Sequence, residues 1–400
     1  MLIRSNFPVD ETFLSSVVNE GLLCIAGSKV CEITLVDSTI TIRSNYSIKD
    51  IFKEVFSSIN RSVSIDMVRN DEHFIEDFKK YFNFDIDIRL TFQDLLSKIK
   101  ENIDNFKFIY DHLDLSLVVR GSTVLFETNK RKVDVGAPQI CKADRFTGYT
   151  SLETTFTTKQ LKQRCLGETA LILILGLLSA YVCSRRDGNN RYYYFLTFAP
   201  DEVLRLYLER SSDLVHKYLI VKEEVMKILG ESYSITPVNE IPITELTLNL
   251  KVQKLLSEGN LDKVSFVLFK IAREEQAYKI YEQIPIRIYR KVAFVDIVER
   301  YFRSPDEFIK RLSKIFEDKE SRLWKALSSL NSKNKFDEAN NVLKAMQGLY
   351  WFVVLGDLHG YYQFVREIFN CYRIYERPKN DAEQKIRDYY RSILEELGRF

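Results

Sequence analysis

Asp357 and His359 are the residues of this 400-residue chain whose types and spacing most directly suggest chemistry. They stand two apart, between Gly356 and Gly360, after an apolar run. A carboxylate and an imidazole at such a spacing can hold a metal ion that activates water for hydrolysis. A two-metal site needs further ligands, and the 40 residues after Gly360 contain no histidine and no second Gly-Asp.

The string Gly-Asp-Leu-His-Gly resembles the first metal-binding motif of calcineurin-like metallophosphoesterases, which implies a metal-dependent phosphoesterase as one alternative. The three other histidines lie far upstream without metal-ligand spacing: His73, His112 and His216. Apolar residues recur every three or four positions from Leu343 to Tyr372, which predicts one continuous helix through the motif. On that helix Gly356 and Gly360 would let a neighbouring helix approach closely. We therefore expect no metal and no cofactor, and a protein that is not an enzyme.

Other catalytic signatures are missing from the sequence. It has no Gly-x-Ser-x-Gly, no Walker-type phosphate loop and no Gly-x-Gly-x-x-Gly. Six scattered cysteines form no Cys-x-x-Cys pair, so we expect thiols in a reducing compartment, the cytoplasm.

Positive charge is concentrated in one segment. Residues 129–191 hold eleven basic and five acidic residues, a net +6, although the whole chain carries only +2. The rest of the chain is therefore at −4. Clustered Lys and Arg are typical of surfaces that contact phosphate, and exposed Arg or Asn can also read base edges.

Two loops in the basic segment are candidate nucleic-acid contacts, "TNKRKVDVGAPQ" and "CSRRDGNNRYYYF". The long irregular stretch between them, Lys142 to Leu161, could follow a nucleic-acid backbone through its hydroxyls and Arg145, or be a surface crossover. The first loop follows a predicted hairpin that turns at Arg120-Gly121-Ser122, and the second contains the turn signal Asp187-Gly188 before a Tyr-rich strand. Tyr192, Tyr193 and Tyr194 alternate faces on that strand, so one of them could stack on a base. The alternative is a solvated hairpin with aromatic core residues. The candidate binding residues are Lys130, Arg131, Lys132, Lys142, Arg145, Arg185, Arg186, Asn189, Asn190 and Arg191.

The pattern along the chain predicts an α+β fold: a mixed α/β N-terminal body followed by a C-terminal helical bundle. Ser47 and Thr91 read as helix caps, "LLCIAG" and "VCEITLVDSTITIRS" as strands, and the apolar run Thr169–Val182 as a buried helix too short to span a bilayer. The middle contains two β-like stretches, "RYYYFLTF" and "IPIRIYRKVAFV", with helices between them. We predict three domains: 1–130, α+β; 131–303, α+β with the basic loops and the buried helix; and 304–400, a helical bundle. Few glycines and many Ile, Lys and Tyr residues suggest heat adaptation.

The order of features over residues 140–375 resembles the large subunit of the archaeal type I-A CRISPR interference complex (archaeal Cascade). The features are "GYTSLETTFTTKQL" before "GETALILILGLLSAYV", then "YYYFLTFAPDEVLRLY", "VSFVLFKIAREEQAYKIYEQIPIRIY" and the helical C-terminus. The resemblance implies an RNA-guided antiviral complex in which guide pairing reads most of the target DNA. Loops of the large subunit would read a short duplex motif and help open the strands. A separate helicase-nuclease would cut the DNA.

On this reading the partners are guide RNA, target DNA and the other subunits of the complex, with no membrane involved. A further alternative is a protein-interaction or structural protein whose basic loops bind no nucleic acid. The salt dependence of duplex binding separates these alternatives.

Overall fold

The computed structural model describes residues 1–28, 31–83, 91–120, 123–126, 135–146, 162–188, 190–274, 277–290, 293–330 and 336–397. Their contacts divide the chain into two compact units. Unit 1 comprises Met1–Lys222 with Ser265–Arg287, and unit 2 comprises Glu223–Val264 with Ile288–Phe400. The contacts thus join the first predicted domain to much of the second. The predicted α+β class is confirmed: unit 1 contains the sheets, and the chain after residue 304 is helical.

Unit 1 opens with a four-stranded sheet of order β2-β3-β1-β4. Strand β1 pairs antiparallel with β3 and parallel with β4, and β2 and β3 form a hairpin through Asp37 and Ser38, both at positive φ. The elements of this part are β1 (Leu2–Ser5), α1 (Phe13–Ala26), β2 (Cys31–Val36), β3 (Thr39–Ser44), α2 (Ile48–Ser58), η1 (Arg69–Asp71), α3 (Glu72–Phe82), α4 (Phe92–Asn102), η2 (Ile103–Asn105) and β4 (His112–Leu115).

The predicted caps are confirmed. The Ser47 hydroxyl accepts from the Asp50 amide at 3.2 Å at the start of α2. Thr91 and Asp94 form a capping box at the start of α4. The stretch "LLCIAG" predicted as a strand is instead the end of helix α1, so that prediction was wrong.

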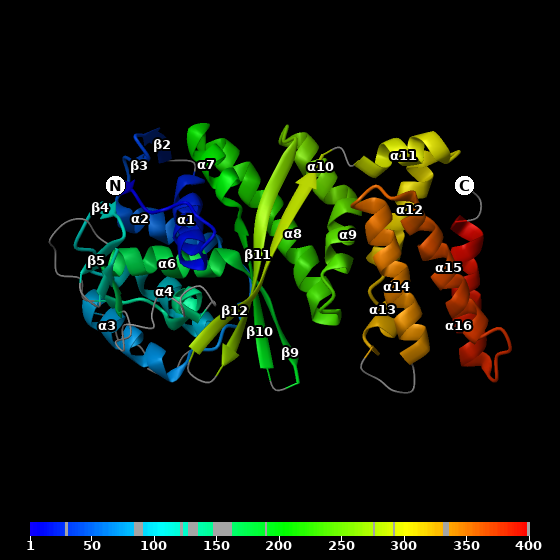
Figure 1. Cartoon of the computed structure of the whole chain (residues 1–400). Coiled ribbons are helices and arrows are strands. Elements are labelled where there is room, and N and C mark those ends of the chain that lie inside the picture. Colours follow the sequence, from blue (N-terminus) through cyan, green and yellow to red (C-terminus); the bar gives the residue numbers. More distant parts are fainter. Residues whose placement is uncertain are drawn as a thin grey trace. The chain divides into compact units, whose positions relative to one another are not determined.

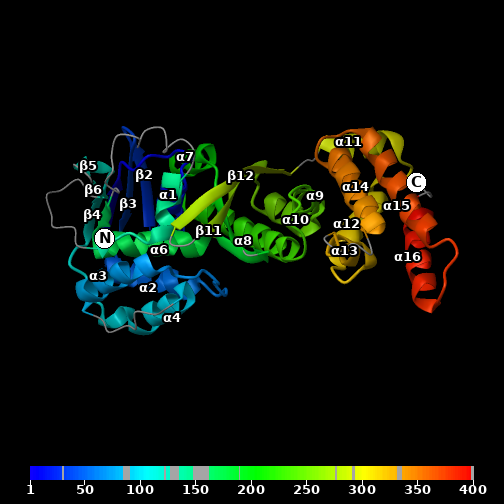
Figure 2. The ribbon, with the colours of Figure 1, turned by 60° about the horizontal axis from the view of Figure 1, so that its bottom comes forward.

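The second part of unit 1 surrounds a wholly buried helix, α6 (Gly167–Ala180), which confirms the predicted buried helix. Gly21 of α1 and Gly176 of α6 face each other's helix so closely that an added Cβ would overlap backbone atoms. Figure 2 shows α2, α3 and α4 together along one side of α6. A short sheet of order β5-β6-β8-β7 adjoins them: β5 (Val118–Arg120), β6 (Thr123–Leu125), β7 (Val135–Gly136) and β8 (Lys162–Cys165), with η3 (Gln139–Phe146) between the last two. The antiparallel β5–β6 pair confirms the predicted hairpin.

The third sheet has the order β12-β11-β10-β9 and contains the long strands visible in Figure 1. Its strands are β9 (Tyr181–Asp187), β10 (Asn190–Phe198), β11 (Lys263–Glu274) and β12 (Ala277–Tyr289). Helices α7 (Pro200–Leu208) and α8 (Ser212–Ile235) follow β10, and the unit boundary falls within α8. Strand β11 was not expected from the sequence. The predicted strand "IPIRIYRKVAFV" is right only as far as Tyr289, because residues from Ala293 form a helix.

Unit 2 is built around one hydrophobic cluster that includes Trp324, Leu349, Phe352, Phe364 and Tyr390. Its helices are α9 (Glu240–Leu248), α10 (Leu250–Glu258), α11 (Ala293–Tyr301), α12 (Pro305–Glu317), α13 (Arg322–Leu327), α14 (Phe336–Val353), α15 (Leu358–Ile374) and α16 (Asp381–Leu397). Figure 1 shows α14, α15 and α16 side by side. Among the described residues, no helix combines the length and the apolar character that a bilayer crossing requires.

Candidate nucleic-acid interface

The β9–β10 hairpin in unit 1 carries the best-defined part of the basic segment. Arg186 pairs with Arg191, and Asp187 with Asn190, across the two antiparallel strands. Gly188 in the turn has φ +59°, a conformation that glycine adopts without steric cost. Asn189 lies outside the described residues. The strand pairing is therefore described up to Asp187 on one side of the turn and from Asn190 on the other.

Arg186 and Asn190 are exposed at this tip. No ion pair joins the Arg186 side chain to another described residue, so its guanidinium is available to solvent. Arg185 is half-buried and lies opposite Tyr192. The hairpin therefore presents one guanidinium and one carboxamide outward, which are the groups that bind phosphates and base edges.

Arg191 has a different environment. Its Nη1 atom donates to Asp66 Oδ2 at 2.6 Å, and its Nη2 atom donates to the Ser64 carbonyl oxygen at 3.2 Å. The Tyr193 hydroxyl donates to the same Asp66 oxygen at 3.1 Å, and burial with this carboxylate raises the pKa of Tyr193 to about 12. These contacts occupy the Arg191 guanidinium. They favour a structural role, in which Arg191 orients the hairpin against residues 64–66.

The three tyrosines of the hairpin also differ. Tyr193 and Tyr194 are 0% and 1% exposed, so they are core residues. Tyr192 is half-buried, with the Lys270 ammonium 5.0 Å from its ring centroid and the Tyr281 ring at 5.5 Å in an edge-to-face arrangement. Tyr192 is therefore the one tyrosine of the three that remains partly accessible to a stacking base.

The helix η3 carries Lys142 and the backbone of Arg145. Its first amide, that of Gln139, donates to Asp71 Oδ1 at 2.7 Å, and Asp71 also interacts electrostatically with Lys142. Burial raises the pKa of Asp71. Lys142 is half-buried beside this carboxylate. Its charge is therefore partly compensated within the structure.

Residues 64–71 contact both the β9–β10 hairpin and η3. Ser64 and Asp66 hold Arg191, and Asp71 holds the start of η3. Seven residue steps span at most roughly 24 Å. The hairpin and η3 are therefore attached to one short piece of chain. Lys130, Arg131 and Lys132 lie outside the described residues, as does the side chain of Arg145.

Sequence reasoning missed Asp66 and Lys270. Asp66 belongs to "VSIDMV", where Val63, Ile65 and Val68 are buried and the polar residues between them point elsewhere. That alternation is the signal that could have placed Asp66 beside a neighbouring strand. Lys270 was missed because β11 was not predicted.

The Gly-Asp-Leu-His-Gly motif forms a turn between two helices, so the prediction of one continuous helix was wrong. Gly356 has φ +69°, and Asp357 Oδ1 accepts from the His359 amide at 2.9 Å as the N-cap of α15. The close helix approach is real but involves Gly348 and Gly360, since a Cβ on Gly360 would overlap the Gly348 carbonyl oxygen. In the part of the chain that the structure describes, no three His, Cys, Asp or Glu side chains gather as metal ligands do.

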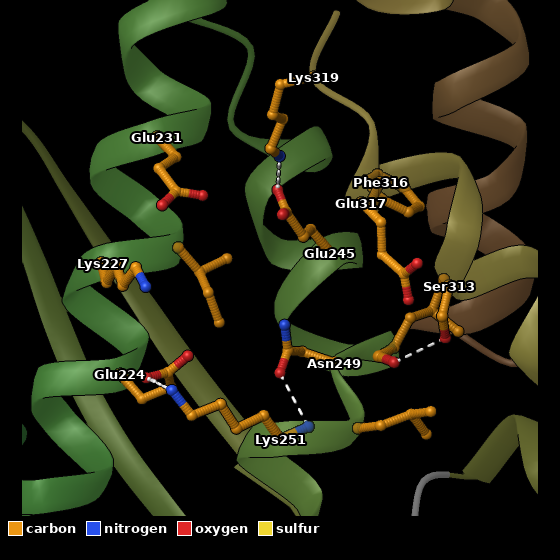
Figure 3. Close-up of a pocket in the computed structure, with 13 residues that line it drawn as sticks. Glu224, Lys227, Glu231, Glu245, Asn249, Lys251, Ser313, Phe316, Glu317 and Lys319 are labelled. Atoms are coloured by element: carbon orange, nitrogen blue, oxygen red, sulfur yellow. Dashed lines mark hydrogen bonds and ion pairs between the residues drawn. The ribbon is translucent and has the colours of Figure 1, made fainter. Parts of the chain in front are cut away.

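Unit 2 also contains a pocket of about 360 Å³ between α8, α9, α10 and α12 (Figure 3). The Lys319 ammonium pairs with Glu245 at 2.5 Å, and Lys251 pairs with Glu224 at 2.5 Å. Burial raises the pKa of Glu245 and lowers that of Lys319. The mixture of paired lysines and glutamates gives the pocket no dominant charge, and it is separate from the basic segment in sequence.

Comparison with known proteins adds one relative. No known family model matches the chain. An uncharacterized protein of Archaeoglobus fulgidus is 37% identical over 396 residues, which cover 99% of each chain. This chain belongs to the same family as that archaeal protein. The match runs through both units, so the family shares the sheets of unit 1 and the helices of unit 2.

Proposed function

We propose that this chain is the non-catalytic large subunit of an RNA-guided CRISPR interference complex of the Cascade type, and that it binds target duplex DNA through the basic segment. In such a complex, base pairing with the guide RNA reads most of the target, and the protein reads a short adjacent motif and helps to open the strands. The partners are guide RNA, target DNA and the other protein subunits. The site of action is the cytoplasm, in antiviral defence.

The observation that carries the proposal is the outward-facing tip of the β9–β10 hairpin. Arg186 and Asn190 are exposed there. Arg191 and Tyr193 of the same hairpin both contact Asp66, and these contacts hold the hairpin in place. A preorganised loop loses less conformational freedom when it binds. Arginine can donate two hydrogen bonds to a guanine, and asparagine can do so to an adenine, in the major groove.

Two further features support it. Of the stretches that carry the family resemblance, "GYTSLETTFTTKQL" lies outside the described residues. The others correspond to α6, to β10 followed by α7, to the β11–β12 hairpin and to the helices of unit 2, in that order. In addition, Asp357 and His359, the one pair suggestive of hydrolysis, form a helix-capping turn. A subunit that positions DNA for a separate nuclease needs no hydrolytic centre of its own.

The test is duplex DNA binding by the full chain over a series of salt concentrations. Arg186→Ala with Asn190→Ala should weaken binding, and the slope of log affinity against log salt should become shallower by about 0.9 for each phosphate that the variant no longer neutralises. Replacing Lys130, Arg131 and Lys132 by alanine should flatten it further. Arg300→Ala, an exposed arginine of α11, is the matched control and should change neither. Unchanged affinity and slope in both sets of variants would overturn the proposal.

A further inference from the structure

The pocket of unit 2 has the size of a small-molecule site. Its volume is about 360 Å³, and ligand pockets in proteins measure roughly 300–1,000 Å³. It is lined by residues from the ranges 224–231, 245–251 and 313–319. These ranges belong to one face of α8, to the junction of α9 and α10, and to the end of α12 (Figure 3). We call this cavity the α8–α12 pocket.

Two ion pairs and a buried hydrogen bond fix the walls of the α8–α12 pocket. Lys251 of α10 pairs with Glu224 of α8. Lys319, which follows α12, pairs with Glu245 of α9. The Ser313 hydroxyl of α12 donates to a backbone carbonyl of α9 at 2.9 Å. All the helices that form the pocket are thus joined by polar contacts, and a prearranged pocket loses less conformational freedom when a ligand binds.

The pair of Lys319 and Glu245 is the most buried charged part of the wall. The two side chains are 19% and 8% exposed, and the Lys319 ammonium lies 3.9 Å from the centroid of the Trp324 ring. Burial raises the pKa of Glu245 and lowers that of Lys319. Charged groups that are desolvated in this way inside a cleft are typical of functional sites.

Three other charged groups line the pocket without being used by the fold. Lys227 and Glu231 lie on α8, and Glu317 lies on α12. Figure 3 shows Glu231 and Glu317 on opposite sides of the pocket. None of the three forms an ion pair with another described residue, in contrast to the lysines at 251 and 319. The pocket therefore offers one ammonium and two carboxylates to a ligand.

The pocket also contains apolar surface and an amide donor. Ile228 and Phe316 are buried side chains of its lining. Asn249 Oδ1 accepts from the amides of Lys251 and Val252, both at 3.0 Å, as the N-cap of α10. The Asn249 amide nitrogen points away from that helix (Figure 3) and forms no hydrogen bond with another described residue. It can therefore donate to an anionic group of a ligand.

We propose that the α8–α12 pocket binds a free basic α-amino acid, lysine or arginine. Such a molecule carries one carboxylate and two cationic groups at neutral pH. Its carboxylate pairs with Lys227 and accepts from Asn249, and its two cationic groups pair with Glu231 and Glu317. Its aliphatic stem packs against the apolar lining, as with Phe316. The ligand's charge of +1 cancels the −1 that the three unpaired side chains leave. This inference is independent of DNA binding by the hairpin in unit 1.

Other classes of small ligand fit the lining less well. A simple anion would meet four glutamates and three lysines, two of which are already paired. A diamine would leave Lys227 without a counter-charge. A metal ion needs several ligands at one point, and no three metal-ligating side chains gather in the described part of the chain.

The test is isothermal titration calorimetry of the full chain with L-lysine, L-arginine and two analogues that each lack one charged group. Cadaverine has no carboxylate, and L-norleucine has no side-chain ammonium. We expect saturable binding of L-lysine and L-arginine. Each analogue should bind about tenfold more weakly than L-lysine or worse, because it leaves a charged group of the pocket without its partner.

Two variants assign the recognition to the residues named. Lys227→Met should abolish the preference for L-lysine over cadaverine, because the carboxylate then has no ammonium to pair with. Glu231→Gln with Glu317→Gln should abolish the preference for L-lysine over L-norleucine. All three side chains are exposed, so the changes should leave the fold intact, which circular dichroism verifies. A loss of stability alone would not change the order of the ligands.

The matched controls are Lys254→Met and Glu299→Gln, two exposed residues of unit 2 that do not line the pocket. Both should bind all four compounds as the wild type does. The proposal would be overturned by the absence of L-lysine and L-arginine binding at about 10 mM. It would also be overturned by cadaverine binding as tightly as L-lysine, or by unchanged ligand preferences in the Lys227 and the Glu231 with Glu317 variants.

Discussion

Asp66 is the residue whose contacts decide how the basic segment is presented. It accepts from Arg191 and from Tyr193, and its carbonyl oxygen accepts from the Tyr278 hydroxyl on β12. Arg191 is therefore used for contacts within the protein, whereas Arg186, five residues earlier, is exposed to solvent. From residue type and position in the turn, both arginines were equally strong candidates for nucleic-acid binding. Only the position of residues 64–66, which are remote in sequence, distinguishes them.

The buried ion pair between Lys222 and Glu20 gives a prediction at the same scale. Their side chains are 2% and 1% exposed, and Glu20 also accepts from the Phe198 amide at 2.6 Å. Burial lowers the pKa of Lys222. Lys222→Met leaves the Glu20 carboxylate buried and unpaired, which should cost about 3–5 kcal/mol in the free energy of unfolding.

The double variant Glu20→Gln with Lys222→Met should recover part of that loss, because neither side chain is then charged. Urea unfolding of the wild type, the two single variants and the double variant measures the coupling. A single variant as stable as the wild type would show that the pair contributes nothing.

Thr91 gives a prediction with a defined pH dependence. Its amide and hydroxyl donate to Asp94, and these bonds hold the pKa of Asp94 below its usual value of 3.8. A lowered carboxyl pKa stabilises the fold above the unfolded value and ceases to do so as pH falls through the folded value. Thr91→Ala should cost about 1 kcal/mol at pH 7, and less below pH ~4. Unfolding free energies at several pH values check this, and a loss independent of pH would contradict it.

Helix ends are well predicted where a local signal exists, and helices and strands are confused where it does not. Ser47 and Thr91 predicted the starts of their helices correctly, because a cap is a local hydrogen-bonding pattern. The short apolar run Leu22–Gly27 fits either a buried helix or a strand, and the Thr12 cap ten residues earlier was overlooked. At the α14–α15 turn, the apolar spacing continues through Gly356 although the chain reverses there. Periodicity cannot register such a reversal, since both helices bury the same kind of face.

The α14–α15 hairpin provides a prediction at this scale. A Cβ on Gly360 would overlap the Gly348 carbonyl oxygen and would lie 2.7 Å from the Phe352 amide nitrogen. Gly360→Ala should therefore force the helices apart and cost about 1–3 kcal/mol. Gly136→Ala is the control, because its added Cβ would meet only Asp77, at 3.7 Å. Thermal unfolding of both variants decides the matter. If Gly360→Ala were as stable as the wild type, the two helices would separate without a cost in the free energy of unfolding.

At the scale of the whole molecule, the net charge of +2 is the sum of one basic segment and a mildly acidic remainder. The sequence alone located the basic excess in residues 129–191, and the fold class followed from the change of pattern near residue 304. The grouping into two units could not be read in the same way, because β11 and β12 return to unit 1 after α9 and α10. Pairing β10 with β11 brings together residues roughly 75 positions apart, and no local pattern records it.

The most direct test of the central claim is the RNA that accompanies the protein. Affinity purification of the full-length chain from its native cells in low salt, followed by RNA sequencing, should yield short RNAs that share repeat-derived ends and differ in their middle parts, together with several further protein subunits. Recovery of the chain without such RNAs, or with only the cellular background, would contradict its assignment to an RNA-guided complex.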